Sequence, residues 1–167
     1  MPALEVIRNS ASMSTVADYT HASLIIPELR ERDPAGIISE LSQVLQRSGC
    51  VPDVLPFYHA ALNQEMLTSS AVECGLTFPH ARLKGIKQLQ FAIGRASQPV
   101  IWGAKGALPV QFIFLLAVPA TNAAPYLHLL AGLASLGKEP EHLAKLRNAP
   151  DANAMFAALQ KVKMRPE

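Results

Sequence analysis

The sequence predicts one α/β domain in which a mixed sheet of about five strands carries helices on both faces. Two segments suggest the sheet: residues 110–118 are almost continuously apolar, and residues 89–93 alternate between apolar and polar side chains. The first pattern is typical of a strand covered on both faces, and the second of a half-buried strand. Because the two segments are close in sequence, we expect them to pair as an antiparallel hairpin.

The composition is that of an ordinary folded protein. The chain has 167 residues, half of them apolar and 17% charged, with a net charge of +2. No dense basic run suggests nucleic-acid binding, and the apolar stretch at 112–118 is too short to span a bilayer. The N-terminus has no apolar signal-peptide core, so we expect a soluble cytoplasmic protein without membrane insertion. Cys50 and Cys74 match no metal-ligand spacing, so we expect free thiols and neither metal nor cofactor.

Helix signals flank the predicted strands on the N-terminal side. Residues 1–20 are poorly patterned and precede a domain that we place at 21–163. The apolar triplet at 24–26 is a strand or a docked leading segment. Asp33 before Pro34 is an N-cap signal for a helix that ends at Gly49. A second helix is predicted after Asp53.

The C-terminal half continues the alternation of strands and helices. Residues 69–75 break the helical period and predict a loop, and 76–78 predict a short strand that ends at Pro79-His80. An apolar stripe over 127–136 predicts a helix after the long strand. His142, Leu143 and Leu146 suggest another short helix, and Asp151 caps a last one.

His80 stands out by its position among the five histidines of the chain, which are His21, His59, His80, His128 and His142. It follows the predicted strand at 76–78, and open α/β sheets place their sites where strands end in loops. Pro79 restricts the backbone before it, and Arg82, Lys84 and Lys105 are candidate sources of positive charge. From the pattern alone, an ordinary turn histidine is the simpler interpretation.

His128 lies on the helix predicted over 127–136. Gly132 and Ser135 follow it at helical spacing, so the histidine shares a face with small residues. Such a face allows another loop to approach the imidazole closely. The alternative is an exposed helix histidine beside a glycine that serves helix packing.

Several linked segments resemble the enzyme IIA domains of the bacterial sugar phosphotransferase system, of the fructose, mannitol and nitrogen-regulatory type. The segment QEMLTSSAVECGLTFPHAR at 64–82 is similar to the family's active-site segment, which leads to a Pro-His pair. VIWG at 100–103, PVQFIFLLAVP at 109–119 and YLHLLAGLA at 126–134 also resemble the family, in the family's order. The likeness spans residues 24–161 and implies a mixed sheet with helices on both sides.

The resemblance also implies a phosphoryl-transfer function. His80 would accept a phosphoryl group from the histidine phosphocarrier protein and pass it to a cysteine of an enzyme IIB component. His128 matches the second family histidine, whose ring would bond phosphate oxygens. Gln64, Ser70 and Arg82 would support the site.

Three departures from the family pattern fall in the active-site segment. Gln64 replaces an arginine, Ser69-Ser70-Ala71 replaces a Ser-Thr-Gly turn, and Glu73-Cys74-Gly75 replaces a Gly-Asn-Gly turn. Together they make the local charge about two units more negative, which disfavours phosphate. Two alternatives therefore stand beside the sugar phosphocarrier: a regulatory module of the nitrogen-related type that contacts a target protein, and a member that is not phosphorylated.

Overall fold

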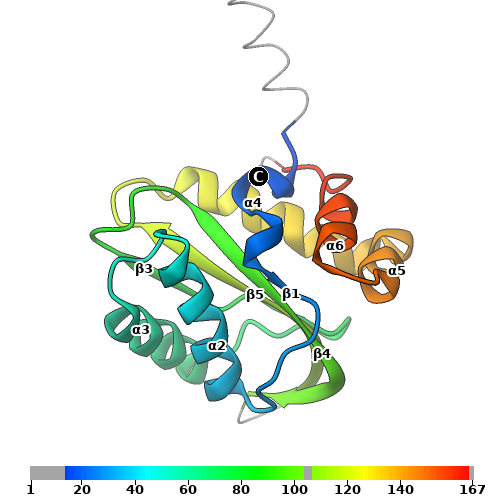
Figure 1. The fold of residues 1–167 in the computed structure, drawn as a ribbon, viewed down its shortest axis with the longest axis horizontal. Coiled ribbons are helices and arrows are strands. Elements are labelled where there is room, and N and C mark those ends of the chain that lie inside the picture. The colour runs from blue at the N-terminus through cyan, green and yellow to red at the C-terminus, as the bar shows by residue number, and fades with distance from the viewer. Residues whose placement is uncertain (1–13, 104–106, 166–167) are drawn as a thin grey trace, which may run out of the picture.

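The sheet is mixed, as the sequence predicts, and five strands of the described residues form it (Figure 1). We analysed a computed structural model of the chain, which describes residues 14–103 and 107–165. The strands are β1 (Ile25–Ile26), β2 (Leu76–Thr77), β3 (His80–Leu83), β4 (Gln90–Trp102) and β5 (Leu108–Pro119). Their order is β1-β4-β5-β2, and β3 also pairs with β5. β4 and β5 form the expected antiparallel pair, while β1, β2 and β3 run parallel to their partners.

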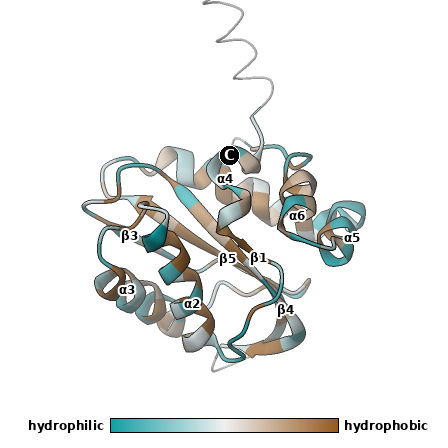
Figure 2. Ribbon diagram, in the orientation of Figure 1, coloured by the Kyte–Doolittle hydropathy of each residue, from teal (hydrophilic) through white to brown (hydrophobic). Residues whose placement is uncertain are grey.

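Helices cover both faces of this sheet. The α-helices of the described residues are α2 (Pro34–Arg47), α3 (Val54–Leu67), α4 (Ala124–Ala134), α5 (Pro140–Asn148) and α6 (Ala152–Leu159). One hydrophobic core joins α2 and α3 to one face, and a second joins α4, α5 and α6 to the other. Hydrophobic residues lie along the central strands, while α5 is largely hydrophilic (Figure 2). No helix in the described ranges combines the length and the apolar composition that a membrane span needs.

The predicted helix starts are confirmed by their caps. The Asp33 carboxylate accepts a hydrogen bond from the Gly36 amide at 2.7 Å, and the Asp151 carboxylate accepts one from Ala154 at 2.8 Å. Asp53 caps α3 in the same way. Gly49 follows α2 with a φ of 85°, which an L-residue rarely adopts. These signals are local in sequence, so they could be read without the fold.

Two strand predictions need correction. The segment 89–93 belongs to a strand that extends to Trp102, and Phe91, Ala92 and Ile93 are fully buried rather than half-buried. The cause is the position of β4 between β1 and β5, where both helix layers cover it. In addition, the predicted strand at 76–78 is followed by a second short strand and not by a loop: after a break at 78–79 the chain rejoins β5, and His80 opens β3. Sequence pattern cannot show this second pairing because it depends on register with β5.

The described part of the N-terminal segment packs against the domain. Val16 is fully buried, and its amide donates to the Val162 carbonyl at 2.8 Å. The Thr20 hydroxyl donates to the Phe91 carbonyl at 2.7 Å. Residues 1–13 of the segment lie outside the described residues.

Candidate functional site

The edge strand formed by β2 and β3 presents different residues to its two faces. Leu76 and Phe78 belong to the core beneath α4, whereas Ala81 belongs to the core beneath α2 and α3. Because side chains alternate along a strand, His80 and Arg82 project towards the α4 face. The break at Pro79 therefore leaves His80 on the same face as Phe78.

The His80 imidazole is only partly buried, and one of its nitrogens faces a backbone acceptor. Nδ1 lies 3.4 Å from the Phe78 carbonyl oxygen. A carbonyl can only accept, so this bond forms when Nδ1 carries the proton of the neutral ring. The lone pair is then on Nε2. The register of β3, with His80 opposite Leu116, fixes the backbone from which this ring projects.

Tyr126 covers the His80 ring from α4. The two ring centroids are 5.3 Å apart, and the ring planes are inclined by 39°. Burial raises the pKa of the Tyr126 phenol above its usual value near 10. Sequence analysis missed this residue, although it stands only two positions before His128.

Arg82 ties β3 to the turn that leads into α4. Its Nε and Nη2 groups donate to the Ala120 carbonyl at 3.2 and 2.9 Å. The guanidinium thus holds the connection between β5 and α4, two residues along β3 from His80. Lys84 is exposed near the end of the same segment, and Lys105 lies outside the described residues.

A buried carboxylate organises the opposite face of the edge strand. Glu65 is 4% exposed. It accepts hydrogen bonds from the Trp102 indole and the Ser70 amide, each at 2.8 Å. The Ser70 hydroxyl donates to it at 2.9 Å, and the Thr77 hydroxyl at 3.1 Å. The Ser70 oxygen in turn accepts from the Phe78 amide at 2.8 Å.

This network of Glu65, Ser70, Thr77 and Trp102, which we call the Glu65 network, was not found by sequence reasoning. Its signal was available: Phe57, Ala61 and Glu65 occupy the buried stripe of α3 at intervals of four residues. An acid in such a stripe requires several donors, because a buried carboxylate without partners is costly. The network also commits the Ser70 hydroxyl proton to Glu65, on the face away from His80.

The residues that depart from the family pattern lie at the surface or, like Ala71 and Cys74, are half-buried. Gln64 and Glu73 are both exposed. Gly75 has a φ of 91°, and among the described residues only glycines have a positive φ. The positions of Ala71 and Glu73 therefore adopt ordinary backbone conformations, and replacing the family's glycines there creates no strain of this kind.

His128 is exposed on α4, and within the described residues it makes no ring contact with His80. Positions two apart on a helix differ by about 200°, so it projects away from the side that Tyr126 occupies. The small-residue face is indeed approached closely, but by the C-terminal segment: a Cβ at Gly132 would lie 2.8 Å from the Lys163 carbonyl oxygen. The structure thus joins His80 to Tyr126 by direct contact.

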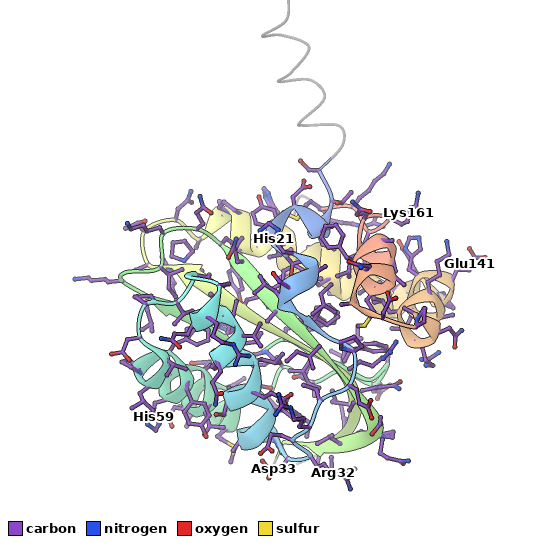
Figure 3. The ribbon with its side chains drawn as sticks, viewed as in Figure 1. His21, Arg32, Asp33, His59, Glu141 and Lys161 are labelled. Atoms are coloured by element: carbon purple, nitrogen blue, oxygen red, sulfur yellow. The ribbon has the colours of Figure 1, made fainter. Side chains whose placement is uncertain are left out.

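The other histidines lie on separate elements. His21 and His59 are exposed, on the N-terminal segment and on α3 (Figure 3). His142 packs on α5 with Nδ1 at 2.5 Å from a Glu139 carboxylate oxygen. Neither Cys50 nor Cys74 forms a disulfide, and within the described ranges no group of three metal-ligating side chains comes together.

A family comparison places this geometry in context. Residues 18–162 match the family model described as "Phosphoenolpyruvate-dependent sugar phosphotransferase system, EIIA 2". The chain belongs to this EIIA family. The match spans every strand and α-helix described above, so the resemblance seen in the sequence is confirmed.

Relatives of this EIIA chain include a nitrogen regulatory protein and a component of a PTS system. A nitrogen regulatory protein of Bradyrhizobium diazoefficiens is 26% identical over 86% of this chain and 94% of its own length. The 2-O-α-mannosyl-D-glycerate-specific EIIABC component of Escherichia coli is also 26% identical, over 88% of this chain but 23% of its own length.

Solved structures confirm the fold. The nitrogen regulatory protein IIA-Ntr from Neisseria meningitidis superposes with a TM-score of 0.76 at 25% identity, covering 86% of this chain and 98% of that one. The mannitol IIA from Escherichia coli gives 0.70 at 14% identity, over 83% and 97% of the two chains. The latter likeness supports the fold alone.

Proposed function

We propose that the chain is a phosphoryl carrier of the phosphotransferase system and that His80 holds the phosphoryl group. The observation that carries the proposal is the state of the His80 ring on the α4 face. Its Nδ1 faces the Phe78 carbonyl, and the ring is partly open to solvent. A neutral imidazole with its lone pair on an accessible Nε2 is a nucleophile near neutral pH.

The transfer step needs no redox partner and no net proton change. The Nε2 lone pair attacks phosphorus, a new P–N bond forms, and the P–N bond to the donor histidine breaks. The donor imidazole recovers its lone pair. In the onward step, a thiolate of an enzyme IIB component attacks phosphorus, and the bond to His80 breaks. Such transfers depend mainly on positioning and on donors to the phosphoryl oxygens.

A regulatory output is a second candidate function. The relative that the chain matches over nearly its full length is named a nitrogen regulatory protein, and so is the Neisseria structure. In that case phosphorylation of His80 would change the contacts of the α4 face with a target protein. The chemistry at His80 is the same in both functions. They differ in the partner of the phosphorylated chain, which is an enzyme IIB component in one and a target protein in the other.

The first test is phosphoryl uptake from phosphoenolpyruvate through enzyme I and the histidine phosphocarrier protein, measured by intact-protein mass spectrometry. We expect one phosphoryl group on the wild type and none on His80→Asn. His59→Asn is the matched control because His59 is exposed and distant in the fold from the α4 face, on the outer helix α3 (Figure 3). Absence of uptake by the wild type, while a control EIIA protein is labelled, would contradict the carrier function.

A second measurement separates transport from regulation. The phosphorylated chain is mixed with an enzyme IIB component, and loss of the phosphoryl group is followed over time. Rapid transfer to the IIB cysteine supports the transport function. A phosphorylated chain that no IIB component discharges favours the regulatory function.

A further inference from the structure

We propose that Tyr126 is a further residue of the phosphoryl-transfer site: its ring orients the His80 imidazole, and its hydroxyl donates a hydrogen bond to the phosphoryl group in transfer. This inference rests on the proposed function of His80. In this site Tyr126 bonds the phosphoryl oxygens, a role that the family resemblance assigns to His128.

The placement of Tyr126 is the first support. Its ring lies against the His80 ring, with centroids 5.3 Å apart. The backbone around this pair is held from both sides: β3 pairs with β5, and Arg82 bonds the Ala120 carbonyl in the turn before α4. Tyr126 follows in the first turn of α4. The ring pair is therefore fixed by a strand, a turn and a helix start.

The second support is that the Tyr126 hydroxyl is available. No hydrogen bond in the described part of the chain engages it. In contrast, the donors that the sequence suggested either bond other groups or lie on another side of α4. The Ser70 hydroxyl donates to Glu65, on the opposite face of the strand. Arg82 directs two of its N–H groups to Ala120. Gln64 supplies no charge, and His128 projects from another side of α4.

The chemistry of a phenol suits this role. The charge of a phosphoryl-transfer transition state is spread over the equatorial oxygens, so one well-placed donor lowers the barrier. Burial raises the pKa of Tyr126, and the hydroxyl therefore keeps its proton throughout the neutral range. Tyr126 gives up no proton in the step. A histidine donor would titrate within this range, so the two donors differ in their response to pH.

The experiment compares Tyr126→Phe with the wild type in the rate of phosphoryl uptake from the phosphorylated histidine phosphocarrier protein. Tyr126→Phe keeps the ring and removes only the hydroxyl. We expect kcat to fall by at least about tenfold, the effect of one hydrogen bond to a charged group, with KM unchanged. The ratio of the two rates should stay constant from about pH 6 to about pH 9, because the phenol is neutral throughout.

The chain offers a matched control. Tyr58 also lies against a histidine, with its ring centroid 5.2 Å from that of His59 on α3. Tyr58→Phe therefore makes the same chemical change at a Tyr–His pair outside the site, and we expect wild-type rates. Tyr126→Leu, which also removes the ring, should change the ¹⁵N shifts of His80 in the unphosphorylated protein, whereas Tyr126→Phe should leave them nearly unchanged.

The outcomes separate the two proposals. Uptake by Tyr126→Phe at the wild-type rate overturns the role of Tyr126 and leaves the function of His80 intact. The role of Tyr126 is overturned in the same way if His128→Asn, and not Tyr126→Phe, slows uptake. If the wild type takes up no phosphoryl group, both proposals fall together.

Discussion

The two faces of the edge strand β2–β3 are built on opposite principles. On the α3 face, the Glu65 carboxylate is 4% exposed and accepts from an indole, a backbone amide and the hydroxyls of Ser69, Ser70 and Thr77. On the α4 face, His80 is partly exposed and has one long contact to a carbonyl. Several donors surround the carboxylate on the first face, whereas on the second face the Tyr126 hydroxyl makes no hydrogen bond within the described residues.

The difference separates a face that stabilises the domain from the face on which we propose phosphoryl transfer. A buried, saturated network holds a loop in one conformation, because breaking any member leaves polar groups unpaired. A phosphoryl carrier needs the reverse at its acceptor atom. The alternation of side chains along the strand keeps the buried network and the acceptor atom apart. Thr77 points to one face, and Phe78 and His80 point to the other. Substitutions on the two faces should therefore have separable effects.

The largest effect is expected from Glu65→Gln. The amide would present an NH2 group to donors, leaving buried N–H and O–H groups without an acceptor, each at a cost of about 1–3 kcal/mol. We expect the free energy of unfolding to fall by about 3–5 kcal/mol in urea denaturation. The matched control is Glu73→Gln, on the exposed part of the loop that follows α3, which should stay within about 0.5 kcal/mol of wild type. Equal stabilities of the two variants would disprove the structural role of the Glu65 network.

Trp102→Phe should have a smaller effect on the same face. It removes the indole N–H that donates to Glu65 at 2.8 Å and leaves the other donors in place. We expect a loss of about 1–3 kcal/mol in the free energy of unfolding, the range for a hydrogen bond to a charged group together with a small cavity. Thermal unfolding followed by circular dichroism measures it. A variant as stable as wild type would show that the indole contributes only its apolar surface.

Gln64→Arg tests the proposed phosphoryl transfer through function rather than stability. Gln64 is exposed near the end of α3, so an arginine there costs little, and a cation at a helix C-terminus is mildly favourable. We expect a few-fold increase in phosphoryl uptake, because the guanidinium adds a positive charge for phosphate oxygens. The unfolding midpoint should not change. Uptake equal to that of wild type would mean that this position does not face the phosphoryl group.

The smallest effect concerns Cys50, away from both faces. Burial raises the pKa of its thiol to about 11. The folded pKa lies above the unfolded one, so the associated stability is present below about pH 9 and is lost as the pH rises through 11. Because the thiol is partly open to solvent, we expect less than about 1 kcal/mol. Cys50→Ser should remove this loss and Cys74→Ser should keep it, in urea denaturation at pH 8 and pH 10.5. Identical pH dependence in both variants would assign the effect to other groups.

The sequence predicted the features that depend on local signals. The helix starts at Pro34, Val54 and Ala152 follow aspartate caps, and the run that forms β5 is apolar because two helix layers cover it. The Pro79-His80 pair is local too, but the choice of His80 as the phosphoryl site came from the family resemblance and stays a prediction.

Features that depend on packing were missed. The break between β2 and β3 is set by register with β5, and no pattern within 76–83 shows it. Tyr126 and His128 share one helix, and only the orientation of α4 against β3 shows that Tyr126 meets His80. Glu65 occupies a stripe position like that of Ala61, which indicates a buried acid, but which side chains donate to it depends on packing.

The most direct test of the account is ¹⁵N NMR of the phosphorylated protein with its histidines labelled. The proposed function assigns the phosphoryl group to one atom: with the Nδ1 proton of His80 on the Phe78 carbonyl, the lone pair is on Nε2. We predict a single phosphorylated histidine, His80, with the phosphoryl group on Nε2 and the proton on Nδ1. A phosphoryl group on Nδ1 of His80, or on His128 or any other histidine, would contradict the account.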